Sequence, residues 1–314
     1  MTLRRLLPTS HGTNREAFAG LDWLLFLSVS LIWGSSFLFM EIGLEAFHPG
    51  LVTWLRVVFG ASVIGLVPRA RRRRAPIAAA DRPRIVVLGA VWIALPLTLF
   101  PLAQQWIDSA VAGMLNGAVP IFTAVLAAFL LRALPGRLQI IGVVIGFGGI
   151  VAVALPSAGT GSTAALGVVL VLVATVCYAV ALNLVTPLQQ AYGSLPVLAR
   201  AQWVAVALVT PFGLYGLVRS SFAWPSLLAT VAVGVFGTGL AFLFMSSLAG
   251  RVGATRAAFI NYVVPVVALV LGVVFLAELV TVIQLVGVGL VIVGAALGSR
   301  REAPTLLATP DAAP

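Results

Sequence analysis

Two short patterns could create a polar site inside an otherwise apolar chain: Asn116-Gly-Ala-Val-Pro120 and Asn261-Tyr-Val-Val-Pro265. In a helix, a proline removes one backbone hydrogen bond and its ring crowds the carbonyl group four residues earlier, which here belongs to an asparagine in both patterns. An amide side chain and a freed carbonyl group at one spot are costly in lipid unless they face protein or a water-filled path. We interpret Asn116 and Asn261 as walls of a cavity and Pro120 and Pro265 as kinks that shape it. Interhelical hydrogen bonding that only holds the helices together is the alternative.

Three further side chains could contribute to such a cavity. Trp33 and Tyr178 both lie near the middle of an apolar run, where a cavity wall is favoured over plain packing. Arg56 lies about six residues inside the next run, and two interpretations stay open for it. Its side chain could snorkel outward to the acidic residues of the exterior connectors. Alternatively, it is an intramembrane cation that attracts an anionic or carboxylate-bearing substrate.

Two polar residues are secondary candidates. Asn183 follows Tyr178 by five residues, so it does not share the same helix face. Glu278 ends an apolar run on the exterior side, where a solvated turn is favoured over proton coupling.

The composition excludes several chemistries. All nineteen basic residues are arginine, so a Walker-type phosphate loop and Schiff-base chemistry both lack their lysine. The single Cys177 cannot form an intrachain disulfide or a multi-thiolate metal site. His11 and His48 fall outside the apolar runs. The sequence therefore predicts a protein that is not an enzyme and that uses no cofactor and no metal.

The apolar runs predict the fold class. Of 314 residues, 61% are hydrophobic and only 9% are charged, with a mean hydropathy of +1.12. Stretches of about 20 apolar residues are long enough to cross a bilayer as helices. We expect an all-α polytopic membrane protein with ten transmembrane helices, at 22–41, 50–67, 84–104, 110–131, 138–155, 165–186, 196–218, 226–247, 254–276 and 280–298.

The arginines predict the orientation of these helices. They concentrate in alternate connectors, as in 69–84, whereas the intervening connectors carry only Arg219 beside several acidic residues. By the positive-inside bias, both termini are cytoplasmic, and the net charge of +10 reflects topology rather than nucleic-acid binding. The connector 187–196 is assigned to the interior although it holds no arginine. We expect no cleaved signal peptide, a cytoplasmic N-terminal segment at 1–21 and a disordered cytoplasmic tail at 299–314.

An internal repeat relates the two halves of the chain. A constant offset of 145 residues aligns the two Asn…Pro patterns and pairs Trp33 with Tyr178. It also aligns these polar and glycine positions: Gln139 with Gln284, Gly142 with Gly287, Gly149 with Gly294 and Gly89 with Gly234. We expect a first five-helix repeat at 22–155, a linker at 156–164 and a second five-helix repeat at 165–298. Because five is odd, the second repeat is inverted in the membrane, an arrangement typical of alternating access around a midplane site.

Three motifs follow one another along the chain: Leu31-Ile-Trp-Gly-Ser-Ser36, Thr53-Trp-Leu-Arg56 and the closing pattern Pro265…Ala277-Glu278-Leu279…Gln284…Gly287…Gly294. In their order and spacing they resemble the motifs of the EamA-type transporters of the drug/metabolite transporter superfamily. The resemblance spans roughly residues 22–298 and implies ten helices in two inverted halves, a central cavity and the movement of small metabolites, often as export. The family's glutamate after the fourth helix is replaced here by Ala133, which argues against a symmetric glutamate pair.

The leading hypothesis is a secondary transporter in a prokaryotic plasma membrane. It would move a small metabolite, amino-acid-like or otherwise polar or amphipathic, and export is the expected direction. A channel-like facilitator and a non-transporting membrane sensor or scaffold are the alternatives. The expected partners are the substrate and the lipid bilayer, with no nucleic acid. The glycines of the fifth and tenth helices would pack helices within the chain or between two protomers of a homodimer.

Overall fold

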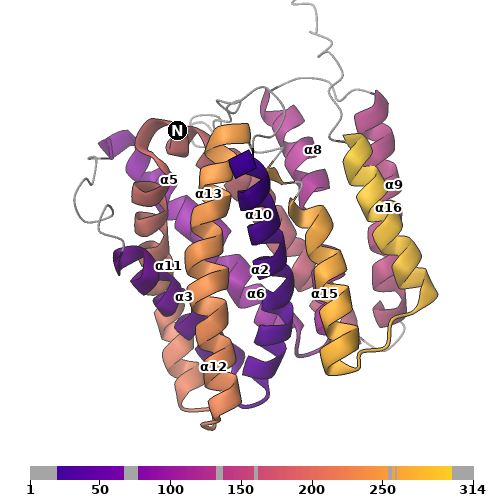
Figure 1. The fold of residues 1–314 in the computed structure, drawn as a ribbon, viewed down its shortest axis with the longest axis horizontal. Coiled ribbons are helices and arrows are strands. Elements are labelled where there is room, and N and C mark those ends of the chain that lie inside the picture. The colour runs from indigo at the N-terminus through magenta and orange to yellow at the C-terminus, as the bar shows by residue number, and fades with distance from the viewer. Residues whose placement is uncertain are drawn as a thin grey trace, which may run out of the picture.

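The structure, a computed structural model, describes residues 20–66, 77–131, 137–158, 162–253, 257–258 and 260–298, where the chain forms a bundle of helices (Figure 1). Among these residues, six helical stretches are long and apolar enough to cross a membrane: Gly20–Leu44, Pro49–Leu66, Ala79–Ala103, Ala164–Tyr192, Ser194–Leu217 and Trp224–Val252. Shorter apolar helices fill the four remaining expected ranges. The prediction of an all-α polytopic membrane protein with ten spans is confirmed. The expected tail at 299–314 and nearly all of the N-terminal segment lie outside the described residues.

Two of the first five spans are interrupted. The third span contains a π-helical segment, and the fourth is broken into two helices at Gly117 and Ala118. The elements of this half are α2 (Gly20–Leu44), α3 (Pro49–Leu66), η1 (Ala79–Asp81), α5 (Arg82–Leu88), η2 (Gly89–Ala94), α6 (Leu95–Ala103), α7 (Ser109–Asn116), α8 (Val119–Leu131) and α9 (Arg137–Ala158).

The second half repeats the π-helical interruption. η2 begins at Gly89, and the residue 145 positions later, Gly234, lies inside the π-helix η3. The elements of this half are α10 (Ser162–Tyr192), α11 (Ser194–Leu217), α12 (Trp224–Ala232), η3 (Val233–Leu240), α13 (Ala241–Val252), α15 (Ile260–Leu276) and α16 (Val282–Gly298). Because π-helical bulges are rare, their recurrence at equivalent positions links both to the architecture of the repeat.

The outward faces of the helices are apolar. Phe129, Phe147 and Phe275 are each more than 60% exposed, as lipid-facing side chains are in a protein viewed without its bilayer. The buried interior also holds polar residues, among them Thr53, Arg56, Asn116 and Gln202. Polar groups that face the bundle rather than lipid are typical of transport pathways.

The fifth and tenth helices pack together through glycine. α9 and α16 stand side by side at one edge of the bundle (Figure 1). A Cβ atom at Gly149 would lie 2.6 Å from the carbonyl oxygen of Gly287, and one at Gly287 would lie 2.8 Å from that of Gly149. The two backbones are therefore in direct contact. These glycines serve a helix interface within the chain, as small residues do in membrane helix pairs.

Candidate functional site

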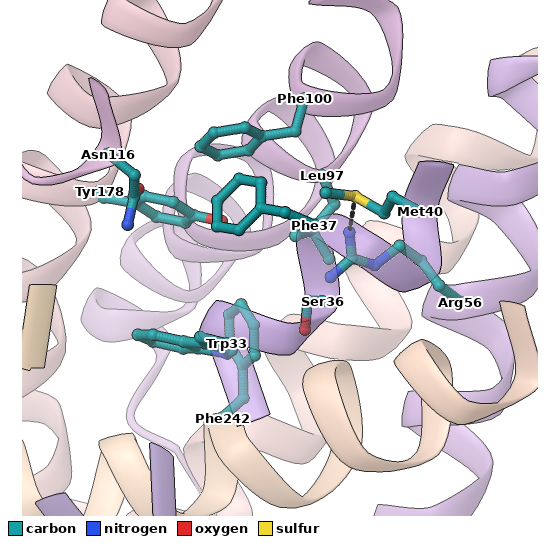
Figure 2. Close-up of a pocket in the computed structure, with 10 residues that line it drawn as sticks. All are labelled: Trp33, Ser36, Phe37, Met40, Arg56, Leu97, Phe100, Asn116, Tyr178 and Phe242. Carbon is teal, nitrogen blue, oxygen red and sulfur yellow. Dashed lines mark hydrogen bonds between the residues drawn. The ribbon is translucent and has the colours of Figure 1, made fainter. Parts of the chain in front are cut away.

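A cavity lies in the interior of the bundle where the two repeats meet. Its wall is aromatic and apolar, with a few polar groups. The lining residues are Trp33, Ser36, Phe37 and Met40 of α2, Arg56 of α3, Leu97 and Phe100 of α6, Asn116 of α7, Tyr178 of α10 and Phe242 of α13 (Figure 2). Of the expected cavity residues, the structure places Trp33, Arg56, Asn116 and Tyr178 on this wall.

The cavity lies near the pseudo-twofold axis that relates the two repeats. Trp33 and Tyr178 occupy equivalent positions, and their rings stack with centroids 6.4 Å apart and an interplanar angle of 12°. Leu97 and Phe242 are also 145 positions apart and both line the cavity. A residue can touch its own counterpart only near the axis that relates the two copies. The cavity therefore lies between the two repeats, close to this axis.

The aromatic side chains form a connected wall. Phe100 stacks on Tyr178 at 6.0 Å, Phe37 meets Phe100 edge-on at 5.4 Å, and Phe242 meets Trp33 edge-on at 5.3 Å. The indole Nε1 of Trp33 donates a hydrogen bond to the carbonyl oxygen of Gly237, 3.0 Å away in η3. This bond fixes the orientation of the indole, so the wall is preformed.

The two expected asparagines are hydrogen-bonded to each other. Asn116 Nδ2 donates to Asn261 Oδ1 at 3.0 Å, and Asn261 Nδ2 donates to the carbonyl oxygen of Ala258 at 3.0 Å. Asn116 lines the cavity, whereas Asn261 is not one of the lining residues. Of the two asparagines, the structure thus places only Asn116 on the wall of this cavity. Within the described residues, Asn116 Oδ1 has no hydrogen-bond partner.

The two prolines have different local roles. Pro120 is the second residue of α8 and follows a break, at which Gly117 and Ala118 donate to carbonyl groups three residues earlier. Pro265 instead lies inside the uninterrupted α15. Its ring packs against the break, since a Cβ atom at Gly117 would lie 3.0 Å from Pro265 Cγ. The expected kink is a full interruption in the first repeat. Neither proline lines the cavity.

The side chain of Arg56 is buried in the cavity wall and is only 3% exposed. Its Nε donates to Thr238 Oγ1 at 3.1 Å, and its Nη1 donates to Met40 Sδ at 2.9 Å. Close packing of α3 on η3 makes this possible, because a Cβ atom at Gly234 would lie 3.0 Å from the backbone of Arg56. The alternative that Arg56 snorkels outward to exterior carboxylates is wrong.

The two secondary candidates lie away from the cavity. Asn183 Nδ2 donates to the carbonyl oxygen of Ala179 at 2.9 Å, a local bond within α10, and more weakly to that of Thr123 at 3.4 Å. Glu278 is not simply part of a solvated turn. Its carboxylate accepts hydrogen bonds from the first two backbone N–H groups of α7. Burial and the neighbouring carboxylate of Glu278 raise the pKa of Asp108, which immediately precedes α7.

Sequence reasoning missed several residues of the site. Thr238 anchors the guanidinium of Arg56, and its carbonyl oxygen accepts a 2.6 Å hydrogen bond from Gln202 Nε2. The offset of 145 would have paired Leu97 with Phe242, but apolar positions are too common in this chain for the match to be informative. Phe37 and Phe100 carry no such signal, because nothing local separates cavity walls from core.

Comparison with known proteins gives consistent matches over nearly the whole chain. The model of the EamA-like transporter family matches residues 22–155 and again 165–300. An uncharacterized transporter of Archaeoglobus fulgidus is 25% identical over 89% of this chain and 99% of its own. A probable terminal-alkyne amino-acid exporter of Streptantibioticus cattleyicolor is 27% identical, over 90% and 96% respectively. A solved crystal structure shares the fold, with a TM-score of 0.63 and 21% identity over 88% of this chain and 96% of that one.

Proposed function

The chain belongs to the EamA-like transporter family, and we propose that it is a secondary transporter that moves a small amphipathic metabolite by alternating access. The observation that carries this proposal is the position of the cavity. A preformed aromatic wall with two buried polar side chains, Arg56 and Asn116, lies where each repeat meets its inverted counterpart. Inverted-repeat transporters place their substrate sites at this point.

The arrangement of the polar groups supports movement of the repeats against each other. Asn116 belongs to the first repeat and Asn261 to the second, and one hydrogen bond joins them. Arg56 of the first repeat is likewise anchored to Thr238 of the second. Each bond crosses between halves that would change their relative position during transport.

The solute class and direction are part of the proposal. The aromatic wall suits an apolar group, and the buried polar side chains suit an amino-acid-like or similarly polar head. One relative is described as a probable amino-acid exporter, which favours export from the cytoplasm. We place the protein in a prokaryotic plasma membrane with both termini in the cytoplasm. In that orientation the arginine-rich connectors 69–84 and 132–137 are inside.

The proposal is tested in proteoliposomes loaded with a defined mixture of amino acids and small organic acids. Counterflow of a labelled solute against an unlabelled gradient is expected for a carrier, without ionic conductance. An open pore would conduct, and a sensor or scaffold would do neither. The Asn116→Ala, Asn261→Ala double variant is expected to fold yet transport slowly. Normal transport by a folded double variant would contradict a site at the Asn pair.

A further inference from the structure

We propose that the cavity selects organic solutes by a carboxylate, bound at Arg56, together with a hydrogen-bond donor, bound at Asn116 Oδ1, and that it rejects organic cations. This inference rests on the proposed function, because it names the class of solute that the transport site accepts. It follows from the hydrogen bonds that the guanidinium of Arg56 makes and from those that Asn116 and Asn261 make.

Among the described residues, Arg56 has donors to spare and forms no salt bridge. A guanidinium carries five N–H groups. In the structure two of them are used, one on the hydroxyl of Thr238 and one on the thioether of Met40, and both partners are neutral. None of the ten lining residues is acidic. A buried charge without a counter-charge is costly, and the planar fork of a guanidinium matches the two oxygens of a carboxylate. A carboxylate entering the cavity would relieve that cost.

The hydrogen bonds of the asparagine pair leave the acceptor atom of Asn116, its Oδ1, unused. The carbonyl oxygen of Ala258 can only accept, so the amide of Asn261 must direct its Nδ2 toward it. The Oδ1 of Asn261 can then only accept, so Asn116 must donate its own Nδ2. This chain of bonds settles the amide orientation, which atom positions alone leave open. Asn116 Oδ1 is therefore the atom left without a hydrogen-bond partner among the described residues, even though Asn116 is buried and only 4% exposed.

The two groups lie on opposite sides of the cavity. Figure 2 shows the guanidinium of Arg56 directed inward from one side and Asn116 on the other, with the rings of Phe37 and Tyr178 between them. A solute that engages both sides therefore needs an anionic group, a donor such as an ammonium, amide or hydroxyl group, and an apolar part against the rings. A solute with a positive charge alone would face the like charge of Arg56. Ring faces would be its main compensation.

The test uses four compounds with the same unbranched apolar chain, two of which carry a donor at the end opposite the carboxylate or amide: 6-aminohexanoate, hexanoate, hexylamine and 6-aminohexanamide. Binding is measured as ligand-induced thermal stabilisation of the purified protein, and transport as inhibition of counterflow. 6-Aminohexanoate is expected to bind best and hexanoate more weakly, because hexanoate lacks the donor. The amine and the amide are expected not to bind. Arg56→Gln is expected to weaken carboxylate binding roughly tenfold to a hundredfold, since it removes hydrogen bonds to a charged group.

Variants separate a binding role from a folding role. Arg56→Lys keeps the charge without the fork and should retain part of the affinity. Arg200→Gln is the matched control, because Arg200 does not line the cavity. Asn116→Leu should abolish the preference for 6-aminohexanoate over hexanoate while both still bind. If Arg56→Gln does not fold, the Asn116→Leu variant and the order of affinities of the four compounds for the wild-type protein decide the question.

The inference and the proposed function fail differently. Binding of hexylamine as tight as that of hexanoate, or full carboxylate affinity in a folded Arg56→Gln variant, would overturn the inference while transport stands. Absence of binding by all four compounds would also overturn it. The proposed function fails if the counterflow experiment with the wider solute mixture shows no movement of any solute, or if the protein conducts ions as an open pore.

Discussion

The carboxylate of Glu278 caps a helix of the opposite repeat at Ser109. Its Oε1 accepts hydrogen bonds from the backbone N–H and the hydroxyl of Ser109, at 2.9 and 2.6 Å, and its Oε2 accepts one from the N–H of Ala110 at 2.8 Å. Ser109 and Ala110 are the first residues of α7, whose last residue is Asn116 of the cavity wall. A negative group at a helix N-terminus satisfies free N–H groups and complements the helix dipole. Glu278 therefore ties the second repeat to the helix that presents Asn116.

Removing this cap should destabilise the protein. We expect Glu278→Ala to lower the free energy of unfolding by about 1–2 kcal/mol, the range for loss of a helix cap. Glu278→Gln should cost less, because its amide oxygen can still accept one of the bonds. Thermal unfolding in detergent measures both. Glu45→Ala is the control, since Glu45 is an exposed acidic residue near the end of the neighbouring α2. An equal loss in both alanine variants would show that Glu278 has no special role.

The hydrogen bond between Asn116 and Asn261 should be visible as energetic coupling. We expect the effects of Asn116→Ala and Asn261→Ala on unfolding to be non-additive, with a coupling of about 0.6 kcal/mol and at most near 1.7 kcal/mol, the range for interhelical bonds in membranes. A double-mutant cycle on thermal or denaturant unfolding supplies the measurement. Strict additivity would mean that the bond contributes nothing to stability.

Substitutions of the two asparagines should also differ in their effect on transport. Asn116 lines the cavity and Asn261 only orients it, so Asn116→Ala should raise KM more than Asn261→Ala does. Counterflow rates over a range of solute concentrations distinguish the two. Larger loss of affinity in Asn261→Ala would contradict the assignment of Asn116 as the contacting residue.

Neighbouring glycines of α9 should respond differently to the same substitution. A Cβ atom at Gly149 would lie 2.6 Å from the carbonyl oxygen of Gly287, whereas one at Gly148 would have nothing within 4 Å. Gly149→Ala should therefore separate α9 from α16 and cost about 1–3 kcal/mol, as overpacking does. Gly148→Ala should be neutral or slightly stabilising, because alanine favours the helix. Thermal unfolding of the two variants side by side checks this, and similar values for both would refute the backbone contact.

Asp108 should make stability depend on pH. Burial and the carboxylate of Glu278 raise its pKa above the ordinary value of 3.8, so the folded state binds a proton more readily than the unfolded state does. The corresponding contribution to stability is full below the unfolded pKa and is lost as pH rises through the folded pKa. Asp108→Asn should thus stabilise the protein at pH 7, and the gain should vanish toward acid pH. Melting temperatures of the wild type and of Asp108→Asn, measured from pH 7 to acid pH, test the direction of this effect. A stabilisation by Asp108→Asn that increases on acidification would contradict it.

The class of the protein and its repeat could be predicted because both depend on local composition. Runs of apolar residues suffice for membrane helices, since each helix satisfies its own backbone in lipid. The offset of 145 residues identified the two asparagines and the pair Trp33 and Tyr178 without any knowledge of packing. The break at Gly117 was only partly foreseen. Proline signals a disturbance, but surrounding contacts determine whether a helix bends or ends.

The sequence by itself thus determined the helices, their number and four of the residues that line the cavity. Only the tertiary structure decided that Asn116 and Asn261 bond to each other rather than face one another across a cavity, and that Arg56 turns inward to Thr238. The physical reason is that hydropathy and periodicity describe one helix at a time. Partners 145 or 182 residues apart are chosen by how helices approach one another, and here glycines and a π-helical segment set that approach.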